Sequence, residues 1–396
     1  MVAMVIGQFG AGVISGARIV FWLAAILLFY VYAGYPLLLA LIGLFVRRPR
    51  VEPGYTPRIS VLIAAYNEEV AIERKIQQTL ELEYPHEKLE VLVLSDCSTD
   101  RTDEIVKAFP DSRVRLVRMP DRRGKTFAQN IGVKEATGEV IIFSDATAIY
   151  HPKALLYLAC NYQDASVGAV SGRYQYFDPG EQSPTGLGSV AFWNYENLIK
   201  KMQSSISTIT GCCGCIYSVR KAAYTELPAD IISDLVQPLQ AIRKGYRVVF
   251  EDRALAYEET TQSTSEEFSM RVRVVTRAMR GLLSVSDLLK PWKFAWPAFQ
   301  LWSHKIMRWM VPLFLIVLLA ANVALIDSPF YKFTLAAQLF FYAAALLNML
   351  LPLHRQWKPL GIPLFFCTLN AAALVSMLEI CRGRKYVTWQ TVRARR

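Results

Sequence analysis

The chain has 396 residues, of which 53% are apolar, and a formal net charge of +11 at neutral pH. This apolar fraction exceeds that of ordinary soluble proteins, so part of the chain is expected to lie in a membrane. The basic residues flank apolar segments and form neither a separate domain nor an RNA-binding motif. That pattern argues against nucleic acid as a partner and for anionic lipid or a phosphorylated substrate.

The first long apolar segment covers residues 19–46, which contain no ionisable side chain other than tyrosine. A helix needs roughly 20 apolar residues to cross a bilayer, so this segment predicts a transmembrane helix. A secretory signal peptide is the alternative. It would be shorter and would begin with several basic residues, whereas only Arg18 precedes the segment.

Three further apolar segments lie near the C-terminus, at residues 310–326, 333–353 and 362–380. The first two are long enough to cross a bilayer. The third is interrupted by Asn370 and Glu379, and polar side chains at membrane depth are costly.

Basic residues predict the orientation of these segments, because they favour the cytoplasmic side. The run RRPR at residues 47–50 follows the first segment, and Lys305 and Arg308 precede the second. The block between them is therefore expected in the cytoplasm, at the inner membrane of a bacterium. The tail at residues 382–396 is also basic and expected inside, so one C-terminal segment should not cross. We expect the third, residues 362–380, to lie at the interface.

The seven cysteines do not indicate a disulfide framework, because their number is odd and the block between the spans is expected in the reducing cytoplasm. The run GCCGC at residues 211–215 could suggest zinc. It lacks paired C-x-x-C units with distant partners, so a tight backbone turn is the preferred interpretation.

The cytoplasmic block alternates short apolar runs, at residues 58–65, 90–94, 114–117 and 140–143, with helical patterns. This alternation predicts a parallel sheet with crossover helices. In such sheets ligands bind beyond the carboxyl ends of the strands.

Polar residues follow three of these runs: Tyr66 and Glu68 after the first, Asp96 after the second and Asp145 after the fourth. They are expected to converge on one rim of the sheet. Carboxylate oxygens suit a hard divalent cation that bridges to phosphates, so Asp145 is the predicted ligand of Mg²⁺ or Mn²⁺. For any one strand the alternative is a turn residue or a helix cap.

Lys125, in DRRGKTFAQN, follows a glycine and begins a predicted helix. Free backbone N–H groups and an ammonium group then coincide, which suits an anion. The run is not a P-loop, which has a longer glycine spacing.

In order along the chain, the motifs AAYNEE, SDCSTDRT, RGK, SDAT, WNYE, GCCGCIYSVR, ISDL and GYRVVFEDRALAYEE resemble the membrane-bound family 2 glycosyltransferases. That group includes cellulose synthases, hyaluronan synthases and ceramide glucosyltransferases. The likeness covers about residues 57–281. It implies an α/β fold, in which a Rossmann-like GT-A nucleotide-diphosphosugar transferase domain is flanked by transmembrane α-helices.

The resemblance implies five units. They are an N-terminal transmembrane helix (1–50), a cytoplasmic GT-A domain (51–290), an amphipathic interface segment (291–309), C-terminal transmembrane helices (310–381) and a basic tail (382–396).

The resemblance also implies roles for the donor-side residues. Tyr66 and Glu68 match the loop at the nucleobase and ribose, Asp96 matches the carboxylate on the nucleoside, and Lys125 matches a donor-site lysine. Asp145 matches the first acid of the metal-binding Asp-x-Asp motif. Thr147 stands where the second acid is usual, so the metal would have one protein carboxylate fewer.

On the acceptor side, Asp234 in ISDL matches the general base of the family, although Ser233 replaces the acid that often precedes it. A helix N-cap is the alternative role for Asp234. Trp193 and Glu196 match an acceptor motif, with core packing as the alternative for the tryptophan.

Arg273, Arg277 and Arg280 share one face of a predicted helix, and we call them the arginine stripe. We expect Arg277 to bind the diphosphate of the donor; the alternative is a solvated basic face near the membrane. Processive relatives carry Gln-x-x-Arg-Trp here, whereas this chain has Val274 and Ala278 in place of the glutamine and tryptophan. Their absence argues against processive synthesis.

The sequence thus predicts an integral-membrane inverting glycosyltransferase that takes sugar from a UDP-linked donor. The acceptor would be a lipid, a lipid-linked glycan or a growing polysaccharide. Two alternatives stay open. One is transfer to a polyprenyl phosphate, and the other is an inactive binding or scaffold subunit, suggested by Thr147, Ser233, Val274 and Ala278.

Overall fold

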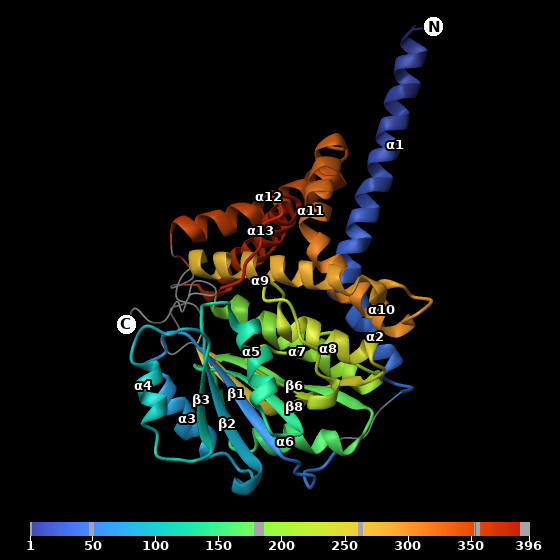
Figure 1. Ribbon diagram of the computed structural model, residues 1–396. Coiled ribbons are helices and arrows are strands. Elements are labelled where there is room, and N and C mark those ends of the chain that lie inside the picture. The colour runs from blue at the N-terminus through green and yellow to red at the C-terminus, as the bar shows by residue number, and fades with distance from the viewer. Residues whose placement is uncertain are drawn as a thin grey trace.

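The computed structural model describes residues 2–46, 51–177, 186–259, 264–351, 353 and 357–388 (Figure 1). The RRPR run at residues 47–50 lies outside the described residues, as does the basic tail beyond residue 388. In Figure 1 a sheet domain lies below a group of helices, and one long helix, α1, leads away from it.

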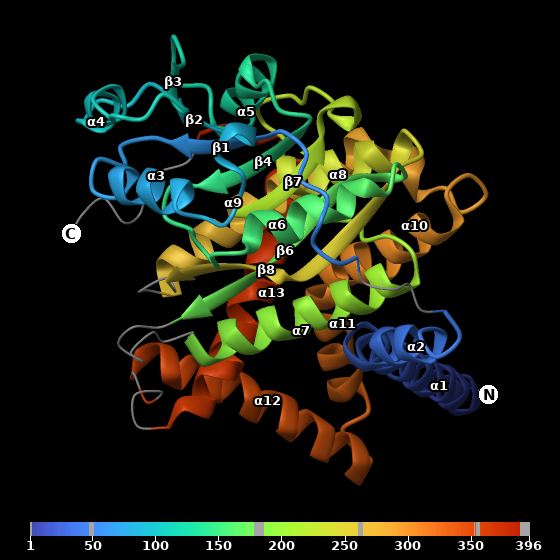
Figure 2. The same cartoon turned by 90° about the horizontal axis from the view of Figure 1, so that it is seen from below.

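The described residues contain an eight-stranded sheet in the order β3-β2-β1-β4-β7-β6-β8-β5, seen from below in Figure 2. Its strands are β1 (Ile59–Ala65), β2 (Leu89–Ser95), β3 (Val114–Arg118), β4 (Val140–Asp145), β5 (Ile149–Tyr150), β6 (Val167–Phe177), β7 (Ile216–Arg220) and β8 (Arg247–Glu259). The first four coincide with the predicted strands and pair in parallel. The prediction of a fully parallel sheet was wrong for β5 and β7, which pair antiparallel to their neighbours. β7 follows a long helix, α7 (Gly186–Ile206), and the turn at residues 211–215, and it runs antiparallel to β4 and β6.

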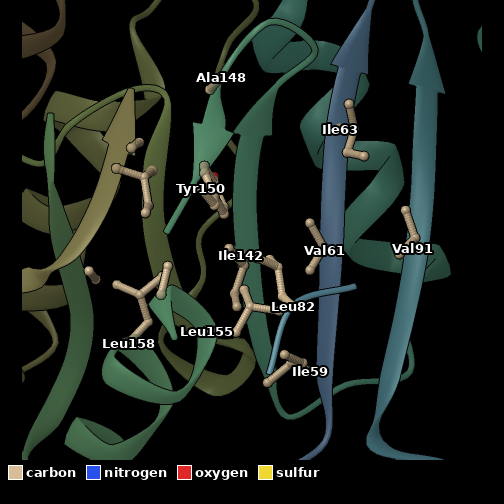
Figure 3. Close-up of a cluster of buried hydrophobic side chains, with 14 of the residues drawn as sticks. Ile59, Val61, Ile63, Leu82, Val91, Ile142, Ala148, Tyr150, Leu155 and Leu158 are labelled. Atoms are coloured by element: carbon tan, nitrogen blue, oxygen red, sulfur yellow. The ribbon is translucent and has the colours of Figure 1, made fainter. Parts of the chain in front are cut away.

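Two apolar cores cover the two faces of this sheet, because neighbouring strand residues point to opposite sides. Val61 and Ile63 join the core under α3 (Ile72–Leu80), α4 (Thr102–Lys107) and α6 (Ala154–Cys160). Figure 3 shows both residues in that cluster with Val91 and Ile142. Leu62 joins the opposite core. That core lies under α5 (Lys125–Glu135), α8 (Ser233–Arg243) and α9 (Thr264–Ser284).

Four helical stretches in the described residues are long and apolar enough to cross a membrane: Ile14–Ile42, Ala295–Ala324, Pro329–Leu350 and Gly361–Cys381. The first contains the C-terminal part of α1 (Val2–Phe29), a π-helical turn (Tyr30–Gly34) and α2 (Tyr35–Ile42). The second comprises α10 (Ala295–Gln300), a π-helical turn (Leu301–Ile306) and α11 (Met307–Ala324). The last two are α12 (Pro329–Leu350) and α13 (Gly361–Cys381).

The second apolar helix is longer than its sequence suggested, because it begins at residue 295 and not near residue 310. Pro297 lies in the first turn of α10, where a missing backbone N–H breaks no helical hydrogen bond. Most of the expected interface segment, residues 291–309, is therefore the beginning of a continuous helix.

Helix α13 packs along α9, which crosses the top of the sheet domain in Figure 1, and against α7 (Gly186–Ile206). Ser376 Oγ donates to the carbonyl of Val272 at 3.1 Å. Beyond α13 the chain turns back, and the carbonyl oxygen of Val387 occupies the place that a Cβ on Gly124 would take. The described end of the chain thus reaches the start of α5.

A glycine sets how closely α5 approaches the sheet. A Cβ on Gly132 would lie 2.6 Å from one methyl carbon of Leu94 and 2.9 Å from one of Leu62. Because overpacking a filled core costs about 1–3 kcal/mol, we expect Gly132→Ala to lower the thermal unfolding midpoint of the detergent-purified protein.

The matched control is Gly54→Ala, because nothing lies within 4 Å of a Cβ at Gly54. Equal unfolding midpoints for the two variants would contradict the close packing of α5 on β1 and β2.

Candidate active site

The loops after β1 and β2 are bound to each other at one rim of the sheet. Asn67, at a positive φ of 55°, accepts the backbone N–H of Thr99 through its side-chain oxygen at 2.8 Å. The backbone N–H of Glu68 donates to Thr102 Oγ1 at 2.8 Å. The ring of Tyr66 lies under the Arg122 guanidinium, whose carbon is 3.6 Å from the ring centroid. The structure therefore brings Glu68 to the loop that follows β2 and Tyr66 to the loop that precedes α5.

Asp96 holds the loop that precedes α5. Its carboxylate accepts the backbone N–H groups of Arg123 and Gly124 at 2.9–3.1 Å. Gly124 has a φ of 91°, a conformation that favours glycine. Burial raises the pKa of Asp96, and the two backbone donors partly offset that rise. Asp96 thus orders this turn, and its contact with a nucleoside stays a prediction.

Lys125 connects three elements at the same rim. Its ammonium group forms an ion pair with Asp145 at the end of β4 and donates to the carbonyl of Gly214 at 3.2 Å. Gly214 belongs to the turn at residues 211–215, which leads into β7. Residues 213–216 form a tight turn that is closed by a bridge between Cys213 and Ile216, as the turn interpretation of GCCGC predicted. Among the described residues, no group of three or more His, Cys, Asp or Glu could hold a metal.

Asp234 lies on the other side of Gly214, in the first turn of α8. A Cβ on Gly214 would be 2.7 Å from Asp234 Oδ2, so only glycine admits the carboxylate there. The helix cap is Ile232, without a side-chain cap bond, so the N-cap alternative for Asp234 was wrong. Burial raises the pKa of Asp234, while the charges of Lys125, Lys200 and Arg277 oppose that rise.

A carboxylate that sequence reasoning missed lies beside Thr147, where the usual second acid is absent. Thr147 Oγ1 donates to Glu258 Oε1 at 2.8 Å, and Tyr174 OH donates to Glu258 Oε2 at 2.7 Å. Glu258 comes from the end of β8, more than a hundred residues later in the chain. The pair of glutamates in AYEE was the available signal, but only the fold shows which residue it faces.

A second residue that sequence reasoning missed, Lys75 of α3, binds the loop that follows Asp145. Its buried ammonium donates to the carbonyl of Ala148 at 2.6 Å and lies 3.9 Å from the centroid of the Tyr150 ring. Burial lowers the pKa of Lys75 to about 7. Lys75, Glu68, Thr147 and Glu258 line a cavity of about 470 Å³, a size usual for small-molecule sites.

Of the two predicted acceptor residues, Trp193 is half-buried and Glu196 is buried. The Trp193 ring packs 4.8 Å from the ring of Tyr174, centroid to centroid, at the edge of a core, so the packing alternative describes its surroundings. Buried Glu196 forms an ion pair with Arg308 and lies 3.2 Å from Nε2 of His304. His304 therefore belongs to a network that joins α7 to the helix that contains α11.

The arginine stripe is partly used in the fold. Arg277 is 7% exposed, and its Nη2 donates to Thr126 Oγ1, Ala229 O and Ile231 O at 2.7–3.2 Å. Arg280 donates to Asp230 at 3.1 Å. The alternative of a solvated basic face was wrong for Arg277. Its contact with a diphosphate stays a prediction.

Comparisons with known proteins all find glycosyltransferases. Residues 60–227 match the family described as Glycosyl transferase family 2. The chain is 26% identical over 227 residues to the probable glycosyltransferase YdaM of Bacillus subtilis, which covers 55% of this chain and 54% of that protein. It is 26% identical over 236 residues to the poly-beta-1,6-N-acetyl-D-glucosamine synthase of Staphylococcus aureus, which covers 57% of this chain and 56% of that one. The chain thus spans just over half the length of these curated relatives.

One solved structure is similar over nearly the whole chain. It is the mannosyltransferase PcManGT from Pyrobaculum calidifontis, in complex with GDP-Man and Mn²⁺. The TM-score is 0.70 at 23% identity, over 92% of this chain and 99% of that one, which establishes a shared GT-A fold. Residues 60–227 therefore form a glycosyl transferase family 2 domain with the GT-A fold, and it lies beside helices that are long and apolar enough to cross a membrane.

Proposed function

We propose that the chain transfers a sugar, with inversion, from a UDP-linked donor to a lipid, a lipid-linked glycan or a growing polysaccharide. One observation carries the proposal. Asp145 and Asp234, from β4 and α8, meet around Lys125 and Gly214, and Asp96 orders the turn before Lys125. The family 2 domain and the names of the relatives, one of them a polysaccharide synthase, support transferase activity.

The donor would bind across the rim. The loops that carry Tyr66 and Glu68 are placed for the nucleoside, beside Asp96. Lys125 begins α5, where free backbone N–H groups and an ammonium favour a diphosphate. Arg277 and Arg273 lie on one face of α9, and Arg273 interacts electrostatically with Asp145. Our assignment of uridine rests on the family resemblance, so a donor screen should include GDP-mannose.

A divalent cation, Mg²⁺ or Mn²⁺, fits the residues near Asp145. Hard cations take oxygen ligands, and the Asp145 carboxylate, the Thr147 hydroxyl and the Glu258 carboxylate supply them. Glu258 would thus provide the acid that the Asp-x-Thr sequence lacks. When bound, such a cation neutralises charge on the departing diphosphate. Mn²⁺ in the structure of PcManGT supports this part of the proposal.

Asp234 is the proposed general base. An acceptor hydroxyl gives its proton to the Asp234 carboxylate as its oxygen bonds to the anomeric carbon and the bond to the nucleotide diphosphate breaks on the opposite face. A base positioned in this way contributes about 100- to 10,000-fold to the rate. The close contact with Gly214 and the turn at residues 211–215 fix the carboxylate for this role.

We also propose that the GT-A domain faces the cytoplasm of a bacterial cell. Lys305 and Arg308 near the start of α11 support this orientation. The return of Val387 to Gly124 supports a C-terminus on the same side, which requires that one C-terminal helix does not cross. The packing of α13 along α9 favours α13 as that interfacial helix.

The test of the function is nucleotide release. The purified protein with Mg²⁺ or Mn²⁺ is expected to release a nucleoside diphosphate from one of a panel of nucleotide sugars. Asp145→Asn and Glu258→Gln are each expected to weaken Mn²⁺ binding, measured by the signal of free Mn²⁺ in electron paramagnetic resonance.

Glu259→Gln, one residue along β8, is the matched control for Glu258. If no donor is hydrolysed and Asp145→Asn binds donors as well as the parent chain, the inactive-subunit alternative is correct.

The pH dependence follows from Asp234. The base must be ionised, and its pKa is raised by burial, so activity is expected to fall as pH decreases through that raised pKa. The acidic limb of kcat/KM should therefore lie above the usual range of an aspartate. Asp234→Asn is expected to lose about 100-fold or more in kcat and to lose this limb. Retention of most activity would instead indicate a phosphate acceptor, which needs little help from a base.

Gly214 is expected to position Asp234. In Gly214→Ala the new Cβ would push Oδ2 of Asp234 aside, because the two would otherwise be 2.7 Å apart. A misplacement of this kind costs about 100-fold in kcat, while the donor KM should change little. Kinetics of nucleotide release separate the two constants, with Gly54→Ala as the control. A change confined to KM would show that Gly214 acts on donor binding instead.

A further inference from the structure

Two lysines beside Asp234 have ammonium groups with no hydrogen bond or ion pair among the described residues. Lys200 lies on α7 and is 4% exposed, and Lys305 lies in the π-helical turn that leads into α11. Two other lysines in this part of the chain do have carboxylate partners. Lys201 pairs with Asp252 at 2.6 Å, and exposed Lys293 lies 3.9 Å from Asp287. The Lys200 ammonium lies 5.9 Å from the centroid of the Trp193 ring, and Lys305 is half-buried. An ammonium held away from water without a carboxylate is costly, so this pair is a place for an anion.

Both lysines lie next to the proposed base, on the side that leads to the membrane. Lys305 Cε and Nζ are 3.7 and 3.9 Å from the place that a Cβ on Gly211 would take. Gly211 and Gly214 belong to one short turn, and Asp234 covers Gly214. Lys200 interacts electrostatically with Asp234 and with Lys305. The turn at residues 211–215 therefore has Lys305 at one end and the base at the other.

The carboxylates near these two lysines already interact with other cationic side chains. Glu196 is held by Arg308 and His304, and Asp145 is held by Lys125. Asp234 interacts electrostatically with Lys125, Lys200, Lys305 and Arg277, and its Oδ1 accepts no hydrogen bond from the described residues. Positive charge thus exceeds negative charge on the acceptor side of the base.

The membrane side of the site indicates what kind of anion this is. Lys305 lies within the apolar stretch Ala295–Ala324, whereas the donor-side cation, Lys125, lies at the start of α5 in the sheet domain. A nucleotide donor at Lys125 would leave Lys200 and Lys305 for the other substrate. An anion reached from that direction is a lipid phosphate, and charge-assisted hydrogen bonds from lysine suit it.

We propose that the acceptor is a lipid-linked sugar whose phosphate or diphosphate binds Lys200 and Lys305 while its nucleophilic hydroxyl faces Asp234. This inference rests on the proposed transferase function and narrows its acceptor to an anionic lipid conjugate. The hydroxyl oxygen attacks the anomeric carbon and its proton passes to Asp234. The linking phosphate takes no part in bond making and is held by the two lysines.

The test measures binding without turnover, so it is separate from the test of activity. Farnesyl diphosphate, farnesol and inorganic diphosphate are titrated into the full chain in nanodiscs of neutral phosphatidylcholine, with UDP and Mn²⁺ at saturation. Farnesyl diphosphate is expected to bind at least tenfold more tightly than either of the other two. Lys200→Gln and Lys305→Gln should each weaken it about tenfold, as expected for one hydrogen bond to a charged group, and leave farnesol unchanged.

Lys201→Gln and Lys293→Gln are the matched controls and should bind farnesyl diphosphate as the parent chain does. Lys200→Arg and Lys305→Arg should retain most of the affinity, because they keep the charge. Three results would overturn the proposal: equal binding of farnesol, equal binding of inorganic diphosphate, or, in nanodiscs loaded with farnesyl diphosphate before any UDP is present, displacement of farnesyl diphosphate when UDP is added. The last would assign the lysines to the donor. A protein that binds the lipid diphosphate but hydrolyses no donor would refute the transferase function alone.

Discussion

The site depends on a close contact between the carboxylate of Asp234 and the backbone of Gly214, where no side chain would fit. The same glycine accepts a hydrogen bond from Lys125 through its carbonyl, and Lys125 pairs with Asp145. One residue without a side chain therefore joins the proposed base to the donor-side lysine and the metal-side acid. The two cysteines next to it, Cys213 and Cys215, are buried, which fits a turn held by packing.

Much of the donor side could be predicted from sequence because it follows local rules. The apolar runs before Tyr66, Asp96 and Asp145 are buried parallel strands, and the carboxyl ends of parallel strands share a rim. The turn before Lys125 was also visible in its glycine. What sequence could not give was the partner of each side chain. Asp96 binds backbone N–H groups, which no pattern of residue types reveals.

The rest of the site was harder to predict because its residues come from elements far apart in the chain. Glu258 meets Thr147 only because β8 pairs with β5, next to the loop after β4. Trp193 and Glu196 were recognised as a motif, yet the fold turns them toward a core and an ion pair. Lys200 and Lys305 belong to no motif, and their lack of a hydrogen bond or ion pair among the described residues appears only when α7 and α11 are placed beside the turn at residues 211–215.

The charges of the site divide into two groups on either side of Asp234. On the donor side Lys125 faces Asp145, so binding an anion there must compete with an existing pair unless a cation takes the carboxylate. A divalent metal at Asp145 would release Lys125 for the diphosphate, which makes metal and donor binding mutually favourable. On the acceptor side Lys200 and Lys305 have no carboxylate of their own to release. An uncharged glycan end would leave that positive charge uncompensated, whereas a phosphate-linked acceptor would balance it and also keep Asp234 close to two cations that favour its ionised form.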